Sequence, residues 1–252
     1  MKPANSNRRP PLIQCVDVAV GYGKPVLQHV NLEIRHGEIV ALLGGSGCGK
    51  STLLRSLSGL TPPIAGDVRL FGESFYDLDP EQQNALRHRL GVAFQQEALF
   101  SSMTIEDNVA LPLRELTRLP SALIREMVRM RLELVGIGNL ARRMPANISG
   151  GQRKRAALAR ASILDPEVIF CDEPTAGLDP VVAAEVDDTL VRFREALGST
   201  IVVVSHELES IRATADRAIM FAKGSVVATG TIDELVHSGD ETVHQFFHAR
   251  TG

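Results

Sequence analysis

The fold is decided by one stretch, Gly44-Gly45-Ser46-Gly47-Cys48-Gly49-Lys50-Ser51. It matches the phosphate-loop pattern G-x-x-x-x-G-K-[ST]. The apolar run before it, residues 39–43, is short enough to be a buried strand, and residues 52–57 after it begin a helix. Glycines at such a turn let successive backbone N–H groups converge on phosphate oxygens, and the helix N-terminus adds the positive end of its dipole. We therefore expect a strand, loop and helix that bind the phosphates of a nucleotide.

The composition is that of an ordinary globular chain. Its 252 residues are 44% hydrophobic and 23% charged, and the net charge of −3 argues against a dedicated nucleic-acid binder. No window approaches about 18 uninterrupted apolar residues, so we expect no membrane span. Residues 1–11 are polar and proline-rich without an apolar signal core, which predicts a flexible N-terminus on a cytosolic protein. Three cysteines are too few for a disulfide framework or a zinc site.

Two acids follow a second apolar run. The apolar residues 168–171 are followed directly by Asp172 and Glu173. A strand that is apolar on both faces is typical of a parallel sheet. Ligands bind at the carboxyl ends of such strands. Lys50 would then reach the β- and γ-phosphates, and the Ser51 hydroxyl would bind Mg²⁺ together with Asp172. Glu173 fits a general base that polarises the attacking water. The alternative interpretation is that Asp172 and Glu173 are two solvent-exposed acids of a loop without a role in a site.

Three more polar or aromatic residues are candidates. Gln95 follows a predicted strand at residues 91–94, and His206 follows another at residues 200–204, so both would face the same pocket. Without the other motifs, Gln95 would be interpreted as a polar loop residue and His206 as a histidine with a structural role only. Tyr22 lies between two glycines, where its ring would either stack on adenine or cover the edge of the sheet.

The elements around these motifs change in kind along the chain. The first part is predicted to be β-rich, with an edge strand at 12–20, a strand at 26–34, and short strands at 68–71 and 74–78. From about 97 to 165 the pattern is helical only. Ser149-Gly150-Gly151-Gln152 then precedes a basic helix and offers a second anion site at a helix N-terminus. A turn containing Asp179 starts the next helix. A hairpin and two short helices close the chain.

The order of these motifs resembles the nucleotide-binding subunit of ABC transporters, over residues 12–248, and the Ser-Gly-Gly-Gln signature separates that family from other phosphate-loop ATPases. The resemblance implies an α/β phosphate-loop ATPase with a RecA-like core, an antiparallel β subdomain and a helical subdomain. It implies one domain at 12–248, with the core and β subdomain at 12–96 and 166–248 and the helical subdomain at 97–165. This chain departs from the family pattern at two positions. Ile148 precedes the Ser-Gly-Gly-Gln signature where the family usually has Leu, and Gly45 lies in the phosphate loop where many members have Pro.

The resemblance also implies ATP and Mg²⁺ as cofactors and a role for each motif. The catalytic residues would be Glu173, His206 and Lys50. The nucleotide-binding residues would be Tyr22, Gly44, Gly45, Ser46, Gly47, Cys48, Gly49, Lys50, Ser51, Thr52, Gln95, Ser149, Gly150, Gly151, Gln152 and Asp179. The metal ligands would be Ser51, Gln95 and Asp172. Residues 149–152 would act in trans, on ATP bound to the second copy of a head-to-tail dimer.

Residues 94–104 and 108–115, and Gln245-Phe246-Phe247 near the C-terminus, look like the ATPases of the MCE/Mla phospholipid-transport systems. This implies integral-membrane permease subunits, an MCE-domain lipid-binding protein, a small STAS-domain protein, and a peripheral position on the cytoplasmic face of the inner membrane. The alternatives are the ATPase of an amino-acid importer or of a lipoprotein-release system. A soluble ABC ATPase of DNA repair or translation is disfavoured, since those carry coiled-coil or zinc inserts or a second cassette.

Overall fold

Two β-sheets form the centre of the computed structural model, which describes residues 10–248. The smaller sheet contains β1 (Ile13–Tyr22), β2 (Lys24–Ile34), β4 (Ala65–Leu70) and β5 (Glu73–Ser74). The larger contains β3 (Ile39–Gly44), β6 (Leu90–Ala93), β7 (Val168–Asp172), β8 (Thr200–Val204), β9 (Arg217–Ala222) and β10 (Ser225–Gly230). The first is antiparallel in the order β2-β1-β4-β5. The second has the order β10-β9-β3-β8-β7-β6, with every neighbouring pair parallel except β10 and β9.

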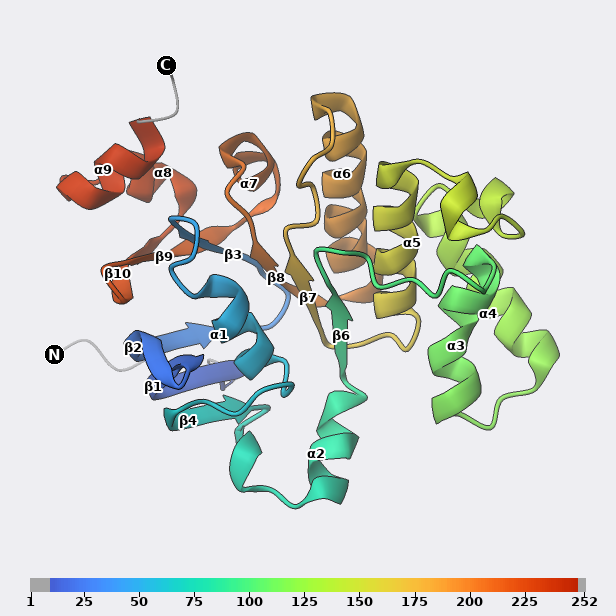
Figure 1. Ribbon diagram of the computed structural model, residues 1–252, viewed down its shortest axis with the longest axis horizontal. Helices are drawn as coiled ribbons and strands as arrows, with labels where there is room; N and C mark the ends of the chain where they lie inside the picture. Colours follow the sequence, from blue (N-terminus) through green and yellow to red (C-terminus); the bar gives the residue numbers. More distant parts are fainter. Residues whose placement is uncertain (1–9, 249–252) are drawn as a thin grey trace, which may run out of the picture.

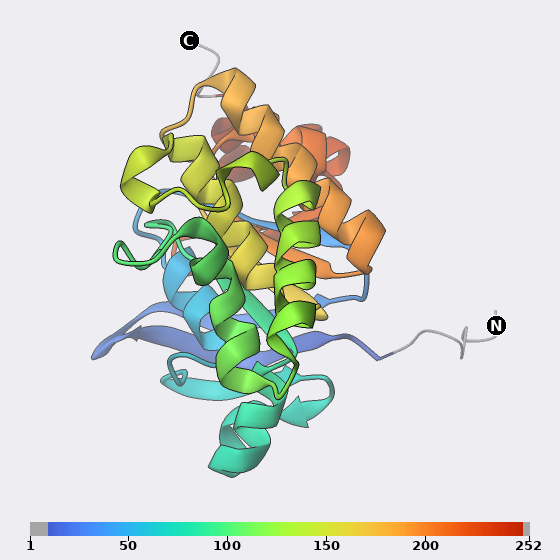
Figure 2. The same ribbon diagram turned by 90° about the vertical axis from the view of Figure 1, so that its right-hand side faces the viewer.

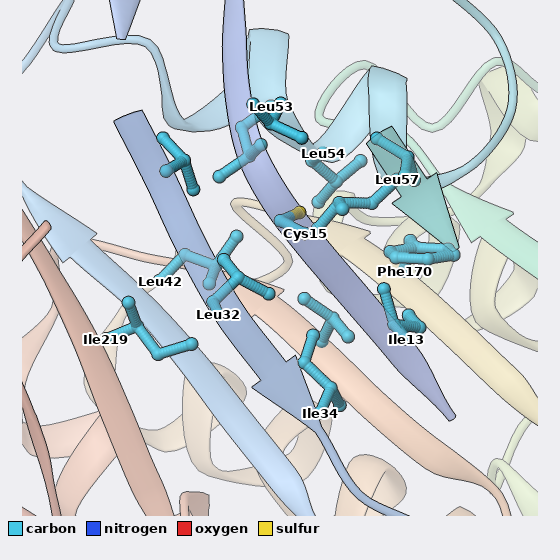
Figure 3. Close-up of a cluster of buried hydrophobic side chains, with 14 of the residues drawn as sticks. Ile13, Cys15, Leu32, Ile34, Leu42, Leu53, Leu54, Leu57, Phe170 and Ile219 are labelled. Atoms are coloured by element: carbon cyan, nitrogen blue, oxygen red, sulfur yellow. The ribbon is translucent and has the colours of Figure 1, made fainter. Parts of the chain in front are cut away.

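Helix α1 (Lys50–Leu57) lies between the two sheets, as Figure 1 shows. Its Leu53, Leu54 and Leu57 are fully buried in one cluster with side chains of β1 and β2 from the small sheet and of β3, β7 and β9 from the large one (Figure 3). Burial of a leucine side chain contributes about 2 kcal/mol. The helix is therefore held from both sides, and the phosphate loop at its N-terminus has a fixed position.

The other face of the large sheet is covered by α5 (Gly150–Ser162) and α6 (Pro180–Leu197). Helices α3 (Ile105–Leu116) and α4 (Ser121–Leu134) pack outside α5, on the right of Figure 1 and at the front of Figure 2. The apolar side chains of these four helices, such as Leu132, Leu158 and Leu190, form a second core with Ile169 of β7 and Ile201 of β8. Short 3-10 turns, η2 (Gly138–Leu140) and η3 (Pro145–Asn147), connect α4 to α5. The predicted all-helical character of residues 97–165 is confirmed.

The C-terminal elements form a third, smaller core. Helices α7 (Leu208–Thr214), α8 (Ile232–Val236) and α9 (Glu241–His248) pack on β3 and β9 through residues that include Leu43, Met220 and Phe247. The predicted hairpin is confirmed, since β9 and β10 pair across Lys223-Gly224. In the part of the chain that the structure describes, no helix has the length and apolar character needed to cross a bilayer. Residues 1–9 of the predicted flexible N-terminus lie outside the described residues.

Two local predictions were wrong. The strand predicted at the edge of its sheet, β1, pairs with β2 on one side and β4 on the other. The strand predicted at 74–78 is only the two-residue β5, followed by a 3-10 turn, η1 (Phe75–Asp77), and by α2 (Pro80–Arg87). Phe75 is fully buried in the core beneath α1, so the chain turns inward there and cannot continue along the sheet.

Candidate active site

A cavity of about 730 Å³ lies where four parallel strands end. The phosphate loop follows β3, and Gln95, Glu173 and His206 follow β6, β7 and β8. The parallel register of these strands brings their carboxyl ends to one side of the sheet. The volume is in the range of small-molecule sites. The cavity is lined by Tyr22, Val26, Gly44, Gly45, Ser46, Gly47, Gly49, Lys50, Ser51, Thr52, Gln95, Glu173, His206 and Phe246.

The phosphate loop turns sharply out of β3. Gly44 has φ +148°, and a Cβ there would lie 2.4 Å from the backbone oxygen of Phe221 on β9. Only glycine fits at this position. Lys50, at the start of α1, is 6% exposed, and its Nζ donates to the carbonyl oxygens of Gly44 and Gly45 at 2.9 Å each. The loop therefore curls around the ammonium group of Lys50 at the N-terminus of the helix.

Two oxygen ligands meet beside this loop. Ser51 Oγ donates a hydrogen bond to Asp172 Oδ1 at 2.9 Å, which joins the start of α1 to the end of β7. Asp172 is buried, and Ser51 lines the cavity. A hydroxyl and a carboxylate in contact next to a phosphate site suit Mg²⁺, which prefers oxygen ligands and is usually held by one or two carboxylates together with substrate phosphates. The donor set fits the predicted metal.

Glu173 and His206 are paired in the cavity. His206 Nδ1 lies 2.8 Å from Glu173 Oε1, and an ionised carboxylate only accepts, so Nδ1 is the donor. Glu173 Oε2 is buried and lies 2.6 Å from the same nitrogen, so both carboxylate oxygens are paired with the imidazole of His206. Glu173 also has φ +52°, a conformation that non-glycine residues rarely adopt and that clusters at functional sites. The contact with His206 and the backbone conformation together fix the position of the Glu173 carboxylate in the cavity.

Tyr22 lies at the rim of the cavity, at the end of β1. The Tyr22 residue is 68% exposed, so its ring is not buried against the edge of the sheet. Its hydroxyl accepts a hydrogen bond from Arg55 Nη1 at 3.2 Å, which holds the ring over α1. The position favours the stacking hypothesis over a covering role. Gln95 is also exposed and lines the same cavity.

Residues 149–152 and Asp179 do not line this cavity but form a group of their own. Ser149 and Gln152 close a capping box at the N-terminus of α5, with Gln152 Oε1 accepting from the Ser149 backbone at 2.9 Å. The turn packs against the start of α6, since a Cβ on Gly151 would lie 2.1 Å from a Val182 methyl group. Asp179 caps α6 by accepting from Val182 N at 3.1 Å. The structure therefore separates the predicted site residues into two groups.

Three residues at or near the cavity were missed by sequence reasoning as site residues. Val26 and Phe246 line it, and Lys154 of α5 reaches the backbone at Gln95 and Glu173. Phe246 was noted only for its likeness to lipid-transport ATPases. Lys154 lies two residues after the Ser-Gly-Gly-Gln turn, where a basic helix reads as a solvated face, and no signal in the sequence marks its burial.

A family model described as ABC transporter matches residues 27–176. The chain belongs to the ABC transporter family. Among its relatives, "Intermembrane phospholipid transport system ATP-binding protein MlaF" of Haemophilus influenzae is 42% identical over 221 residues, covering 88% of this chain and 84% of MlaF. MlaF of Escherichia coli K12 is 39% identical over 236 residues, covering 93% and 88%. "Probable ribonucleotide transport ATP-binding protein mkl" of Mycobacterium leprae is 40% identical over 225 residues, covering 89% of this chain and 65% of mkl.

Solved structures of ABC cassettes share the fold. The ATP-binding cassette MJ0796, in a dimeric post-hydrolysis state bound to ADP and Pi, matches with a TM-score of 0.80 at 30% identity, over 87% of this chain and 98% of that one. CbiO1 of Clostridium perfringens, part of the transporter complex CbiONQ, matches with a TM-score of 0.83 at 29% identity, over 96% of both chains. The predicted ABC-ATPase fold is confirmed. The chain is an ATP-hydrolysing ABC ATPase, the ATP-binding subunit of a transporter.

Proposed function

We propose that this ABC ATPase uses ATP and Mg²⁺ to drive phospholipid transport of the MCE/Mla type through a separate permease. The observation that carries the proposal is the phosphate-loop cavity with its Glu173–His206 pair, in a chain 42% identical to an intermembrane phospholipid transport ATPase over most of both lengths. Phosphoryl transfer needs positioning and charge stabilisation more than covalent chemistry, and the cavity supplies both.

The nucleotide lies along the cavity from Tyr22 to His206. The Tyr22 ring stacks on adenine, and residues 44–52 receive the phosphates on backbone N–H groups at the N-terminus of α1. Lys50 donates to the β- and γ-phosphates in place of the loop carbonyls that it contacts at 2.9 Å. We expect Tyr22→Ala to weaken ATP binding about tenfold through lost stacking and burial, and Tyr22→Phe to retain it. Equal loss in both variants would exclude stacking.

Mg²⁺ would be held by Ser51, Gln95 and Asp172, and would neutralise charge on the phosphates. Glu173 polarises the attacking water and takes its proton on the carboxylate that His206 holds in the cavity. His206 orients that carboxylate through Nδ1 and contacts the γ-phosphate. These roles place acid–base work and charge stabilisation on side chains at the ends of neighbouring strands.

The second group of residues serves the other copy of a head-to-tail dimer. Residues 149–152 form a partly exposed anion site at a helix N-terminus, and this site lies outside the chain's own cavity. The similar cassette MJ0796 is dimeric. In the proposed dimer, this turn and Asp179 close on ATP held by the phosphate loop of the partner copy. Bound ATP joins the two copies, and its hydrolysis releases them.

The relatives support the proposed transport system, since MlaF is named for intermembrane phospholipid transport. For a system of this kind we propose permease subunits, an MCE-domain protein and a small STAS-domain protein as partners, and a place on the cytoplasmic face of the inner membrane. The similarity to mkl, named a probable ribonucleotide transport protein, supports a second candidate function for this chain, the transport of ribonucleotides. The domain limits that we propose remain 12–96 with 166–248 for the core and β subdomain, and 97–165 for the helical subdomain.

The decisive experiment is recovery of the tagged chain from gently solubilised membranes, with identification of the proteins that accompany it. An MCE-domain protein and a permease are expected. An amino-acid permease with a periplasmic binding protein would contradict phospholipid transport, and a ribonucleotide permease would favour the second candidate. Absence of any membrane protein would contradict a transport role.

The assigned base is tested by turnover in the same complex. Glu173→Gln is expected to keep ATP binding, to trap the dimer, and to lower ATP turnover by a factor of about 10² to 10⁴. Lys50→Ala is expected to lose nucleotide affinity, because the ammonium that contacts the phosphates is gone. Full turnover by the Glu173→Gln protein would refute the assignment of the base.

A further inference from the structure

Helix α5 holds the segment that follows β6 through two basic side chains. Lys154 Nζ donates to the carbonyl oxygen of Gln95 at 2.6 Å. Six residues further along the helix, Arg160 donates to the carbonyl oxygens of Glu97 and Ala98 at 2.9 and 2.8 Å. Glu97 and Ala98 have φ of +36° and +52°, which non-glycine residues rarely adopt. The charged donors of α5 keep the segment in this disfavoured conformation.

Lys154 has a second contact that Arg160 lacks. Its Nζ also donates to the carbonyl oxygen of Glu173 at 3.3 Å. Glu173 is itself at φ +52°, and its N–H donates to Val204 O at 2.8 Å. Two hydrogen bonds therefore fix the backbone of Glu173: its N–H donates to Val204 of β8, and its carbonyl oxygen accepts from Lys154 of α5. The direction in which the Glu173 carboxylate points depends on these two bonds.

The ammonium group of Lys154 is placed where a charge is costly. The residue is only 7% exposed, and burial lowers its pKa, while the carboxylates of Glu97, Glu173 and Asp172 act in the opposite direction. A buried cation is retained only where its donors are used. Here they bind two loop carbonyl oxygens, one of the proposed Mg²⁺ ligand Gln95 and the other of the proposed base Glu173.

Lys154 lies on the same rigid helix as the turn at residues 149–152. The helix has 13 residues, and its N-terminal turn packs against the start of α6. A displacement of that turn would therefore be transmitted along α5 to the ammonium group two residues beyond Gln152, and from there to the carbonyl groups of Gln95 and Glu173 that it binds.

We propose that Lys154 is a positioning residue for ATP hydrolysis, tying the backbone at Gln95 and Glu173 to α5 so that the base is aligned only when the N-terminal turn of that helix is in place. This inference rests on the proposed roles of Glu173 and of the turn. Lys154 contacts neither the phosphates nor the water. It acts through the backbone of residues that do, so its loss should slow the chemical step and leave ATP binding intact.

The test compares Lys154→Met with a buried cation that has a structural role only. Arg131 of α4 is equally buried and donates to Ser162 O at 2.6 Å, at the far end of α5, and to Asp165. Full-length chain, in complex with the membrane proteins that copurify with it, is assayed for ATP turnover and for thermal stability. We expect Lys154→Met to lower kcat about tenfold with KM for ATP within about twofold, whereas Arg131→Met lowers Tm and leaves kcat within about twofold.

Lys154→Arg keeps the charge and the donors and is expected to recover kcat to within about threefold. If Lys154→Met does not fold, Lys154→Gln replaces it, with the same expected fall in kcat at unchanged KM. A kcat within twofold of the unmodified protein, or an equal loss in ATP binding, would overturn the inference. Glu173→Gln in the same assay separates the two proposals. If Glu173→Gln is inactive and Lys154→Met is fully active, only the inference about Lys154 fails. If Glu173→Gln is fully active, the assignment of Glu173 as the base fails, and the inference that rests on it fails too.

Discussion

A buried carboxylate links the two helices that follow Asp179 and His206. Asp187 of α6 is 6% exposed and accepts a hydrogen bond from Ser210 Oγ of α7 at 2.6 Å. Burial raises the pKa of Asp187 from 3.8 to about 6; Glu207 and Asp188 add to the shift, and the bond from Ser210 opposes it. The folded state therefore binds this proton more tightly than the unfolded chain does.

The sign and size of the effect on stability follow. The contribution of the protonated carboxyl is complete below pH 3.8 and is lost as the pH rises through about 6. Since each factor of ten in the proton-binding constant is worth about 1.4 kcal/mol, the loss by pH 7.5 is about 3 kcal/mol. About half of this falls between pH 5 and pH 7.5. Asp187→Asn keeps an oxygen that accepts from Ser210 and removes the ionisation.

The assay is urea unfolding of both proteins at pH 5.0 and pH 7.5. We expect the stability of Asp187→Asn relative to the unmodified chain to rise by about 1.4 kcal/mol between the two pH values and to level off above pH 7. An exposed carboxylate elsewhere on α6 offers a control: Glu195→Gln should change by less than about 0.5 kcal/mol over the same range. A difference for Asp187→Asn that stays constant with pH would refute the reasoning.

Two further predictions concern close packing and the cysteines. A Cβ on Gly91 would lie 2.2 Å from a backbone oxygen of α5, so Gly91→Ala should lower the urea midpoint by the equivalent of about 1 to 3 kcal/mol, while Gly239→Ala, with open space around it, should not; equal effects would contradict this. Burial raises the pKa of Cys15 and of Cys171 to about 12, so a maleimide at pH 8 should modify only Cys48 in the folded chain, and ATP should slow it.

Much of the fold was predictable from the sequence because its signals are local. The strand ending at Val204 was placed to the residue and the strand ending at Asp172 to within one residue, since each is a short apolar run bounded by polar residues or glycine. The helix after the phosphate loop and the closing hairpin depend on equally short patterns. Predictions failed where a long-range contact overrides the pattern, as at Phe75, whose burial under α1 ends β5 after two residues.

The sequence by itself determined which residues are candidates for the chemistry, because the phosphate loop, the acids at the end of β7 and the Ser-Gly-Gly-Gln turn each need a particular residue at a particular spacing. Only the tertiary structure decided which of them meet. The parallel register of β3, β8, β7 and β6 brings Lys50, Glu173 and His206 to one cavity and leaves residues 149–152 outside it. It also buries Lys154 against two backbone carbonyls, and contacts between a side chain and a distant backbone group leave no periodic trace in a sequence.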